Sequence, residues 1–243
     1  MPAAAIATGV YVYGVVRAEE LPAVSAEGVA GAPVELLEHN GLAALVSKLP
    51  QGEFRVKRRD LHRHLSVLEE TFAETTVVPC PFGTVVESEA DVEAALLSGQ
   101  RDQLLATLRR LDGMLQLNLK AVYDEEELLR ELVSANPELA QLRNAAGYHD
   151  KLRLGELVAA LVSERREADA EQLVAQLSGV ADDVVIEPAG EYVALKASFL
   201  VPRKKLARFD ERLDEIARRE QPRMQFEVIG PLPPTAFAAA TGG

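Results

Sequence analysis

The sequence predicts an α+β protein of two domains, the first a modified α+β sandwich and the second of ferredoxin-like order with inserted helices. Its 243 residues are long for one compact domain. Segments of strand and helix character alternate along both halves. From Met114 onward the order is β, inserted helices, α, β, β, α, β, which without the insertion is the βαββαβ pattern. The predicted boundaries are 1–113, 114–234 and a flexible tail at 235–243.

The first domain opens with a strand, a loop and a hairpin. Residues 8–16 are rich in β-branched and aromatic side chains, which suit a half-buried sheet. Residues 17–33 hold two prolines and two glycines and predict a loop. An Asn-Gly dipeptide separates two short strands, at 34–39 and 42–48. This dipeptide predicts a hairpin, because a type I′ turn needs positive φ at both central positions.

A helix and an irregular β segment come next. Leucines at helical spacing predict an amphipathic helix over 56–75. Residues 76–86 return to β character, but Pro79 and Pro81 lack the N–H groups that a central strand needs. We therefore expect a kinked or edge crossing there. Two short helices are predicted at 88–97 and 101–111.

The second domain begins with a strand at 114–123, followed by Asp124 as a helix N-cap. An Asn-Pro pair at 136–137 ends that helix and begins another. The remaining predicted elements are a long helix at 148–177, strands at 183–187 and 192–200, a helix at 202–219 and a strand at 223–229.

Composition narrows the functional classes. Acidic residues outnumber basic ones by 38 to 26, and a net charge of −12 argues against a nucleic-acid partner. One cysteine cannot form an internal disulfide or a thiolate metal cage, which fits a reducing cytoplasm. No stretch reaches the roughly 18 apolar residues that spanning a bilayer requires. We expect a soluble cytoplasmic protein that binds neither nucleic acid nor a lipid membrane.

Few residues suggest chemistry. His62 and His64 lie two apart on a predicted helix, so they cannot share a metal ion, and we interpret His64 as structural. Cys80 stands between two prolines without the helix N-terminus or cation that activates a thiol. Tyr11 and Tyr13 share one face of the first strand, as base-stacking aromatics do, but the accompanying RNA-binding signature is missing. Phosphate-binding glycine loops are also missing. The sequence therefore predicts no enzyme, no metal site and no cofactor.

A basic run at 55–59, with Arg63, lies at the start of the helix predicted at 56–75. Cations are poorly placed there against the helix dipole. The mismatch suggests an external acidic partner or a nearby acidic loop, and the alternative is an ordinary solvated face.

Five segments, in order, resemble the gas vesicle protein F/L family. They are TGVYVYGVV at 8–16, LHRHLSVLEETF at 61–72, VVPCPFGTVV at 77–86, GYHDKLRLGELVAALV at 147–162 and GPLPPTAF at 230–237. Together they span nearly the whole chain. Cys80 and Thr235 depart from the family pattern, which leaves the subfamily open between F, L and a fusion-type variant.

The resemblance implies a two-domain α+β protein needed for gas vesicle assembly, located at the gas vesicle or in the cytoplasm. It implies contact with the small hydrophobic shell protein and with other gas vesicle accessory proteins, and no catalytic residues. The motif positions carried over as structural or partner-contact residues are Pro79, Phe82, Gly83, Thr84, Gly230, Pro231, Pro233, Pro234 and Phe237.

Physical chemistry suggests how such contacts form. An apolar partner needs a sheet edge or an apolar groove, and the segment at 77–86 is a candidate edge. The proline-rich segment at 230–234 can pack as an extended arm. Two other readings stay open: a ligand-binding regulatory module, favoured by an apolar pocket with convergent polar groups, and an enzyme of unrecognised type.

Overall fold

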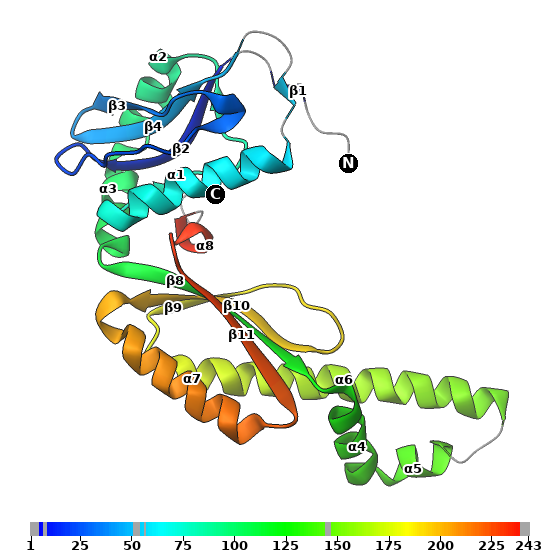
Figure 1. The fold of residues 1–243 in the computed structure, drawn as a ribbon. Helices are drawn as coiled ribbons and strands as arrows, with labels where there is room; N and C mark the ends of the chain where they lie inside the picture. The colour runs from blue at the N-terminus through cyan, green and yellow to red at the C-terminus, as the bar shows by residue number, and fades with distance from the viewer. Residues whose placement is uncertain (1–4, 7–8, 51–53, 56, 144–146, 239–243) are drawn as a thin grey trace. The chain divides into compact units, whose positions relative to one another are not determined.

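The computed structural model describes residues 5–6, 9–50, 54–55, 57–143 and 147–238. The chain folds into two units. Unit 1 comprises Met1–Gln116 with Pro231–Gly243, and unit 2 comprises Leu117–Gly230. Each unit combines a β-sheet with helices, so the predicted α+β class is confirmed (Figure 1).

The sheet of unit 1 has the order β3-β4-β2-β6, and β7 also pairs with β2. All of these pairings are antiparallel. The strands are β2 (Val10–Arg17), β3 (Glu35–His39), β4 (Leu42–Lys48), β6 (Val78–Pro79) and β7 (Val85–Val86). Strands β1 (Ala5–Ile6) and β5 (Phe54–Arg55) pair separately. Thr8, where the first strand was predicted to begin, lies outside the described residues.

Two local predictions in this sheet follow from backbone chemistry. Asn40 and Gly41 have φ angles of 51° and 83°, so the β3–β4 hairpin turns as the dipeptide predicted. The proline-containing segment contributes only the two-residue strands β6 and β7. Both pair with β2 on the side away from β4, so the segment crosses at the edge as expected.

Helices cover the sheet of unit 1. Helix α1 (Arg58–Glu74) packs on β2 together with the 3-10 turn η1 (Val29–Gly31). Helix α2 (Glu89–Asp91) continues into a π-helical turn, η2 (Val92–Ser98), where one α-helix was predicted, and α3 (Arg101–Leu111) follows. Consecutive residues of β2 and β4 are buried, so both faces of these strands are covered.

Gly14 shows how closely unit 1 is packed. A Cβ atom added there would lie 2.8 Å from Val77 Cγ2 and 2.8 Å from the Val78 carbonyl oxygen. Glycine therefore lets the backbones of β2 and β6 approach each other. The core between α1 and the sheet includes Leu68 of α1 and Tyr11 and Tyr13 of β2.

The sheet of unit 2 has the order β11-β8-β10-β9, and Figure 1 shows β8 and β11 side by side. Its strands are β8 (Met114–Tyr123), β9 (Asp183–Ile186), β10 (Val193–Pro202) and β11 (Met224–Leu232). Its helices are α4 (Glu125–Ala135), α5 (Pro137–Arg143), α6 (Tyr148–Leu177) and α7 (Leu206–Glu220), with the 3-10 turn η3 (Arg203–Lys205) before α7. The Asp124 side chain accepts the Glu127 N–H at 3.0 Å, which confirms the predicted N-cap.

The C-terminal region differs from the prediction. Strand β11 continues to Leu232, and Thr235–Ala238 form a short helix, α8, where a flexible tail was predicted. The reason is burial: the Phe237 side chain is 2% exposed, and α8 contacts β6. The rest of the predicted tail, residues 239–243, lies outside the described residues. Among the helices that the structure describes, none is long and apolar enough to cross a membrane.

Candidate functional site

A pocket of about 600 Å³ in unit 1 brings together the two proline-containing motif segments. Four parts of the chain line it: α1, the segment from β6 to the residue before β7, the turn and helix that follow, and α8. The lining residues are Leu61, His64, Leu65, Val78, Pro79, Cys80, Pro81, Phe82, Thr84, Leu96, Gln100, Leu104, Thr235 and Ala238. None of them carries a formal charge apart from the titratable His64.

The wall formed by α1 follows from helical spacing. Leu61 and Leu65 are four residues apart and therefore lie on one face of the helix. Each is 38% exposed, and Phe82 across the pocket is 37% exposed. Partly exposed large apolar side chains around a concave surface are typical of a binding site.

His64 fixes the loop that carries Phe82. The Tyr11 hydroxyl accepts the Gly83 N–H at 2.9 Å and lies 3.1 Å from His64 Nδ1. Burial lowers the pKa of His64 to about 4, and a hydrogen bond to the Cys80 backbone opposes this shift. The ring is therefore neutral at pH 7. The Phe82 ring packs edge-on against it, with 5.5 Å between centroids.

Tyr13 closes the core behind the pocket. Its hydroxyl donates to Ser47 Oγ at 2.9 Å and accepts the Val29 N–H at 2.7 Å. Burial raises the pKa of both Tyr11 and Tyr13, so neither ionises near neutral pH. Both side chains are fully buried. They cannot serve as an exposed platform for stacking nucleic-acid bases.

Cys80 is a weak nucleophile in this setting. Its side chain is half-buried, and burial raises the pKa of its thiol to about 12. The thiol therefore stays protonated at neutral pH. Within the described residues, no group of three His, Cys, Asp or Glu side chains is placed to hold a metal ion. The arrangement is suited to binding an apolar group.

The sequence-predicted motif residues have different positions. Pro79, Phe82 and Thr84 line the pocket, and the Gly83 N–H supports it through Tyr11. Phe237 is buried in α8, whose residues Thr235 and Ala238 line the pocket.

The residues between β11 and α8 form a connection. Pro233 and Pro234 are buried, and their carbonyls accept the N–H groups of Thr235 and Phe237. The Ala236 N–H donates to Gln116 Oε1 at 2.9 Å. Gly230 and Pro231 are exposed at the end of β11. The segment at 230–234 thus ends a strand and leads into a buried helix.

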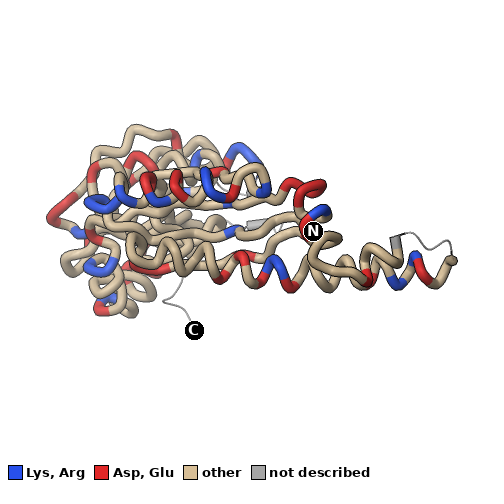
Figure 2. Tube along the Cα trace, turned by 90° about the horizontal axis from the view of Figure 1, so that it is seen from below, with Lys and Arg blue, Asp and Glu red and all other residues tan. Residues whose placement is uncertain are grey.

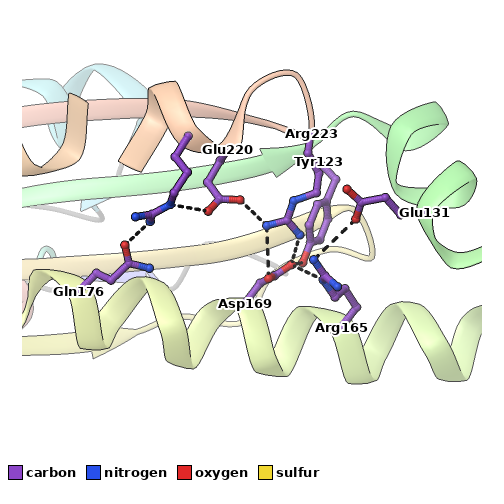
Figure 3. Close-up of polar contacts among 8 residues, drawn as sticks. Tyr123, Glu131, Arg165, Asp169, Gln176, Glu220 and Arg223 are labelled. Atoms are coloured by element: carbon purple, nitrogen blue, oxygen red, sulfur yellow. Dashed lines mark hydrogen bonds and ion pairs between the residues drawn. The ribbon is translucent and has the colours of Figure 1, made fainter. Parts of the chain in front are cut away.

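Sequence reasoning missed a polar network in unit 2, centred on Asp169 of α6 (Figure 3). Its carboxylate accepts the Tyr123 hydroxyl at 2.7 Å, Arg165 Nε at 3.0 Å and Arg223 Nη1 at 2.6 Å. Burial alone would lower the pKa of Arg223, but hydrogen bonds to Asp169 and Glu220 raise it.

Only part of this network had a sequence signal. Arg165 and Asp169 have the four-residue spacing of a helical ion pair. Tyr123 comes from β8 and Arg223 directly precedes β11, both far away in sequence, so no local pattern links them to Asp169. Elsewhere, Figure 2 shows acidic and basic residues interspersed along the chain.

Comparison with known proteins places the chain in a family. The model of the family described as "Gas vesicle synthesis protein GvpL/GvpF" matches residues 9–239. Gas vesicle protein F of a Streptomyces species is 36% identical over 236 residues, covering 93% of this chain and 98% of the relative. Gas vesicle protein F of Dolichospermum flosaquae is 25% identical, covering 94% and 96%.

Solved structures agree in fold. The crystal structure of GvpF from an Anabaena species superposes with a TM-score of 0.81 at 24% identity, covering 96% of this chain and 98% of that one. GvpF from Microcystis aeruginosa gives a TM-score of 0.75 at 24% identity, covering 95% and 98%. Because the family model matches nearly the whole chain and the Streptomyces relative covers most of it, this chain belongs to the GvpL/GvpF family of gas vesicle proteins.

Proposed function

We propose that this protein is a gas vesicle accessory or minor structural protein, without enzymatic activity, that binds the hydrophobic shell protein and supports gas vesicle assembly. Family membership supports the link to gas vesicles. The proposed locations are the gas vesicle and the cytoplasm around it, and the proposed partners include other gas vesicle accessory proteins.

The observation that carries the proposal is the unit 1 pocket. Two motif segments that are about 150 residues apart in sequence contribute to one apolar pocket, through Phe82 and α8. A hydrophobic, self-assembling subunit needs a partner that covers its apolar surface during assembly, and a groove in a folded domain can do so. Strand addition at β6 is the less favourable mode, because β6 contacts α3 and α8.

Unit 2 is proposed to be a ferredoxin-like domain that carries α4 and α5 as its insertion. The strand order β11-β8-β10-β9 supports this assignment, since it equals 4-1-3-2 when the four strands are numbered along the chain. The domain boundaries at 1–113 and 114–234 remain part of the proposal.

The contact site is tested by co-purification with the shell protein. We expect Phe82→Ala and a truncation after Gly230 to reduce retention of co-expressed shell protein. Leu152→Ala is the matched control, because Leu152 is an apolar side chain on α6 that is 54% exposed. Undiminished retention by both test variants would exclude the pocket as the contact site.

The assembly role is tested by deletion. Cells that lack this gene are expected to form few or no gas vesicles by electron microscopy, and the unmodified gene is expected to restore them. Normal vesicles in the deletion strain would refute the assembly role.

The pocket also favours a second reading, a ligand-binding regulatory module. It combines apolar walls with the polar side chains of His64, Thr84 and Gln100. Native mass spectrometry of the purified protein separates the two readings. A small molecule that co-purifies and is lost in Phe82→Ala would favour the regulatory module.

A further inference from the structure

The exposed face of α1 continues beyond the pocket toward a pair of cations. Lys57 and Arg58 precede Leu61 by four and three residues, so they lie one helical turn from it on the same face. Both are exposed, and within the part of the chain that the structure describes neither has a carboxylate partner. We call Lys57, Arg58, Leu61, Leu65 and Glu69 the α1 stripe.

Two other cations of unit 1 do have carboxylate partners in this protein, whose net charge is −12. Arg63, on the same helix, pairs with Glu27 at 2.7 Å, and Lys48 pairs with Glu89 at 2.9 Å. The acidic loop that the sequence allowed as a partner for this basic run therefore reaches Arg63, and among the described residues it makes no ion pair with Lys57 or Arg58.

The position of these cations is unfavourable for the helix itself. The N-terminus of a helix carries a partial positive charge, so a lysine at the N-cap and an arginine at the first position are repelled by it. Asp60, buried in the first turn, offsets this repulsion by accepting the Lys57 N–H at 2.9 Å. An external carboxylate would relieve it further.

The other end of the α1 stripe has the opposite charge. Glu69 follows Leu65 by four residues and is exposed. The stripe thus runs from positive through apolar to negative over twelve residues, or about 18 Å at the rise of an α-helix. Its apolar middle is the wall of the uncharged pocket.

From this pattern we propose that the α1 stripe and the pocket bind one amphipathic helix of the shell protein. The apolar side chains of that helix enter the pocket, and an aspartate or glutamate near one end lies against Lys57 and Arg58. Charge complementarity selects this occupant over a purely apolar segment. A helix fits better than a strand, because prolines in the pocket wall lack N–H groups and β6 contacts α3 and α8.

The inference rests on the proposed function and sharpens it by naming the chemistry of the contact. Its test is the double variant Lys57→Glu/Arg58→Glu, with Lys204→Glu/Arg208→Glu as the matched control. Lys204 and Arg208 are exposed cations near α7 for which the described structure shows no carboxylate partner. Each protein is co-expressed with tagged shell protein, and the amount retained is measured in low and high salt.

We expect the double variant to retain shell protein about tenfold less tightly in low salt, because two attractions become repulsions. Retention by the unmodified protein is expected to fall as salt rises, whereas the double variant changes little. Misfolding is separable from this result, since glutamates at a helix N-terminus favour the dipole. The thermal midpoint of the double variant should therefore stay equal or rise.

An array of overlapping shell-protein peptides gives a second readout. The peptide that binds the unmodified protein is expected to carry a carboxylate beside its apolar residues, and replacing it by the corresponding amide is expected to abolish binding. Equal retention by the double variant and the control, or a binding peptide without a carboxylate, would overturn this inference alone. No retention by the unmodified protein would overturn the proposed function, and this inference with it.

Discussion

At the scale of single residues, His64 decides how the pocket responds to pH. Its ring is buried and neutral, with a pKa of about 4, whereas an unfolded histidine titrates near 6.5. Between these values the unfolded state binds the proton and the folded state does not. The contribution of His64 to stability is therefore present above about pH 6.5 and is lost as pH falls toward 4.

The first prediction follows from this difference. Lowering the pH from 7 to 5 is expected to reduce the free energy of unfolding by about 2 kcal/mol through this group alone. In urea unfolding, the free energy of unfolding of His64→Gln is expected to fall by about 2 kcal/mol less between pH 7 and pH 5 than that of the unmodified protein. The control variant is His62→Gln, at an exposed position two residues away on the same helix, and it should show the same decrease as the unmodified protein. Identical pH dependence in both variants would show that His64 is not held neutral.

At the scale of elements, the Asp169 network joins helix α6 to strand β8 and to the start of β11. The Asp169 and Arg223 side chains are 5% and 12% exposed, so both charges are largely removed from water. Such a pair adds little net stability compared with apolar packing, but removing one partner leaves the other uncompensated. The network therefore specifies how these elements align more than how stable unit 2 is.

This gives the second prediction. Asp169→Ala is expected to destabilise unit 2 by about 3–5 kcal/mol, because Arg223 stays buried without its carboxylate. Glu171→Ala, an exposed acid on the same helix, is expected to change stability by about 0.5 kcal/mol or less. Denaturant unfolding compares the two. A double variant, Asp169→Leu/Arg223→Met, is expected to recover much of the loss, and failure to recover would show that the hydrogen bonds themselves are required.

The third prediction concerns Gly155, inside helix α6. Apart from the neighbouring residues and the backbone of α6 itself, a Cβ atom at this position would meet no atom within 4 Å. Gly155→Ala is therefore expected to stabilise the protein by about 0.5–1 kcal/mol, because alanine loses less backbone entropy in a helix. Gly14→Ala is the contrasting variant, since its Cβ would meet Val77 and Val78 at 2.8 Å. Thermal unfolding of the two variants should therefore shift in opposite directions.

The elements that sequence predicted correctly are those with a local physical cause. The Asn40-Gly41 turn and the Asp124 cap depend on residues within four positions of each other. The elements that it missed depend on distant packing. Helix α8 exists because Phe237 is buried in unit 1, and the Asp169 network needs strands and helices from 123 to 223. The π-helical turn at Val92–Ser98 also had no local signal.

The candidate site likewise has parts that the sequence predicts and parts that it does not. The family-motif residues at 79–84 lie at the pocket, whereas their β-branched residues and prolines predict only an irregular β segment. His64 and the α1 wall could be assigned to a helix from leucine spacing, but not to a pocket. The pocket needs α8, and no periodicity in the sequence connects α8 with α1.

At the scale of the whole molecule, the chain returns at its end to the unit in which it began. Unit 1 comprises Met1–Gln116 and Pro231–Gly243, so two separate parts of the chain form it. Phe237 is 2% exposed, α8 contacts β6, and Ala236 is hydrogen-bonded to Gln116. A fragment that ends at residue 113 would lack the buried Phe237 side chain, the contact of α8 with β6 and the hydrogen bond between Ala236 and Gln116.

The fourth prediction tests this closure. Phe237→Ala is expected to destabilise unit 1 by about 3–5 kcal/mol, the usual cost of emptying a phenylalanine site in a core. Hydrogen exchange measured by mass spectrometry should show faster exchange in β6 and α1, with unchanged protection in β10 and α7 of unit 2. Phe237→Leu, which keeps most of the apolar volume, is expected to lose less. Equal loss of protection in both units would mean that they unfold as one, and the C-terminal helix would then stabilise the whole chain rather than unit 1.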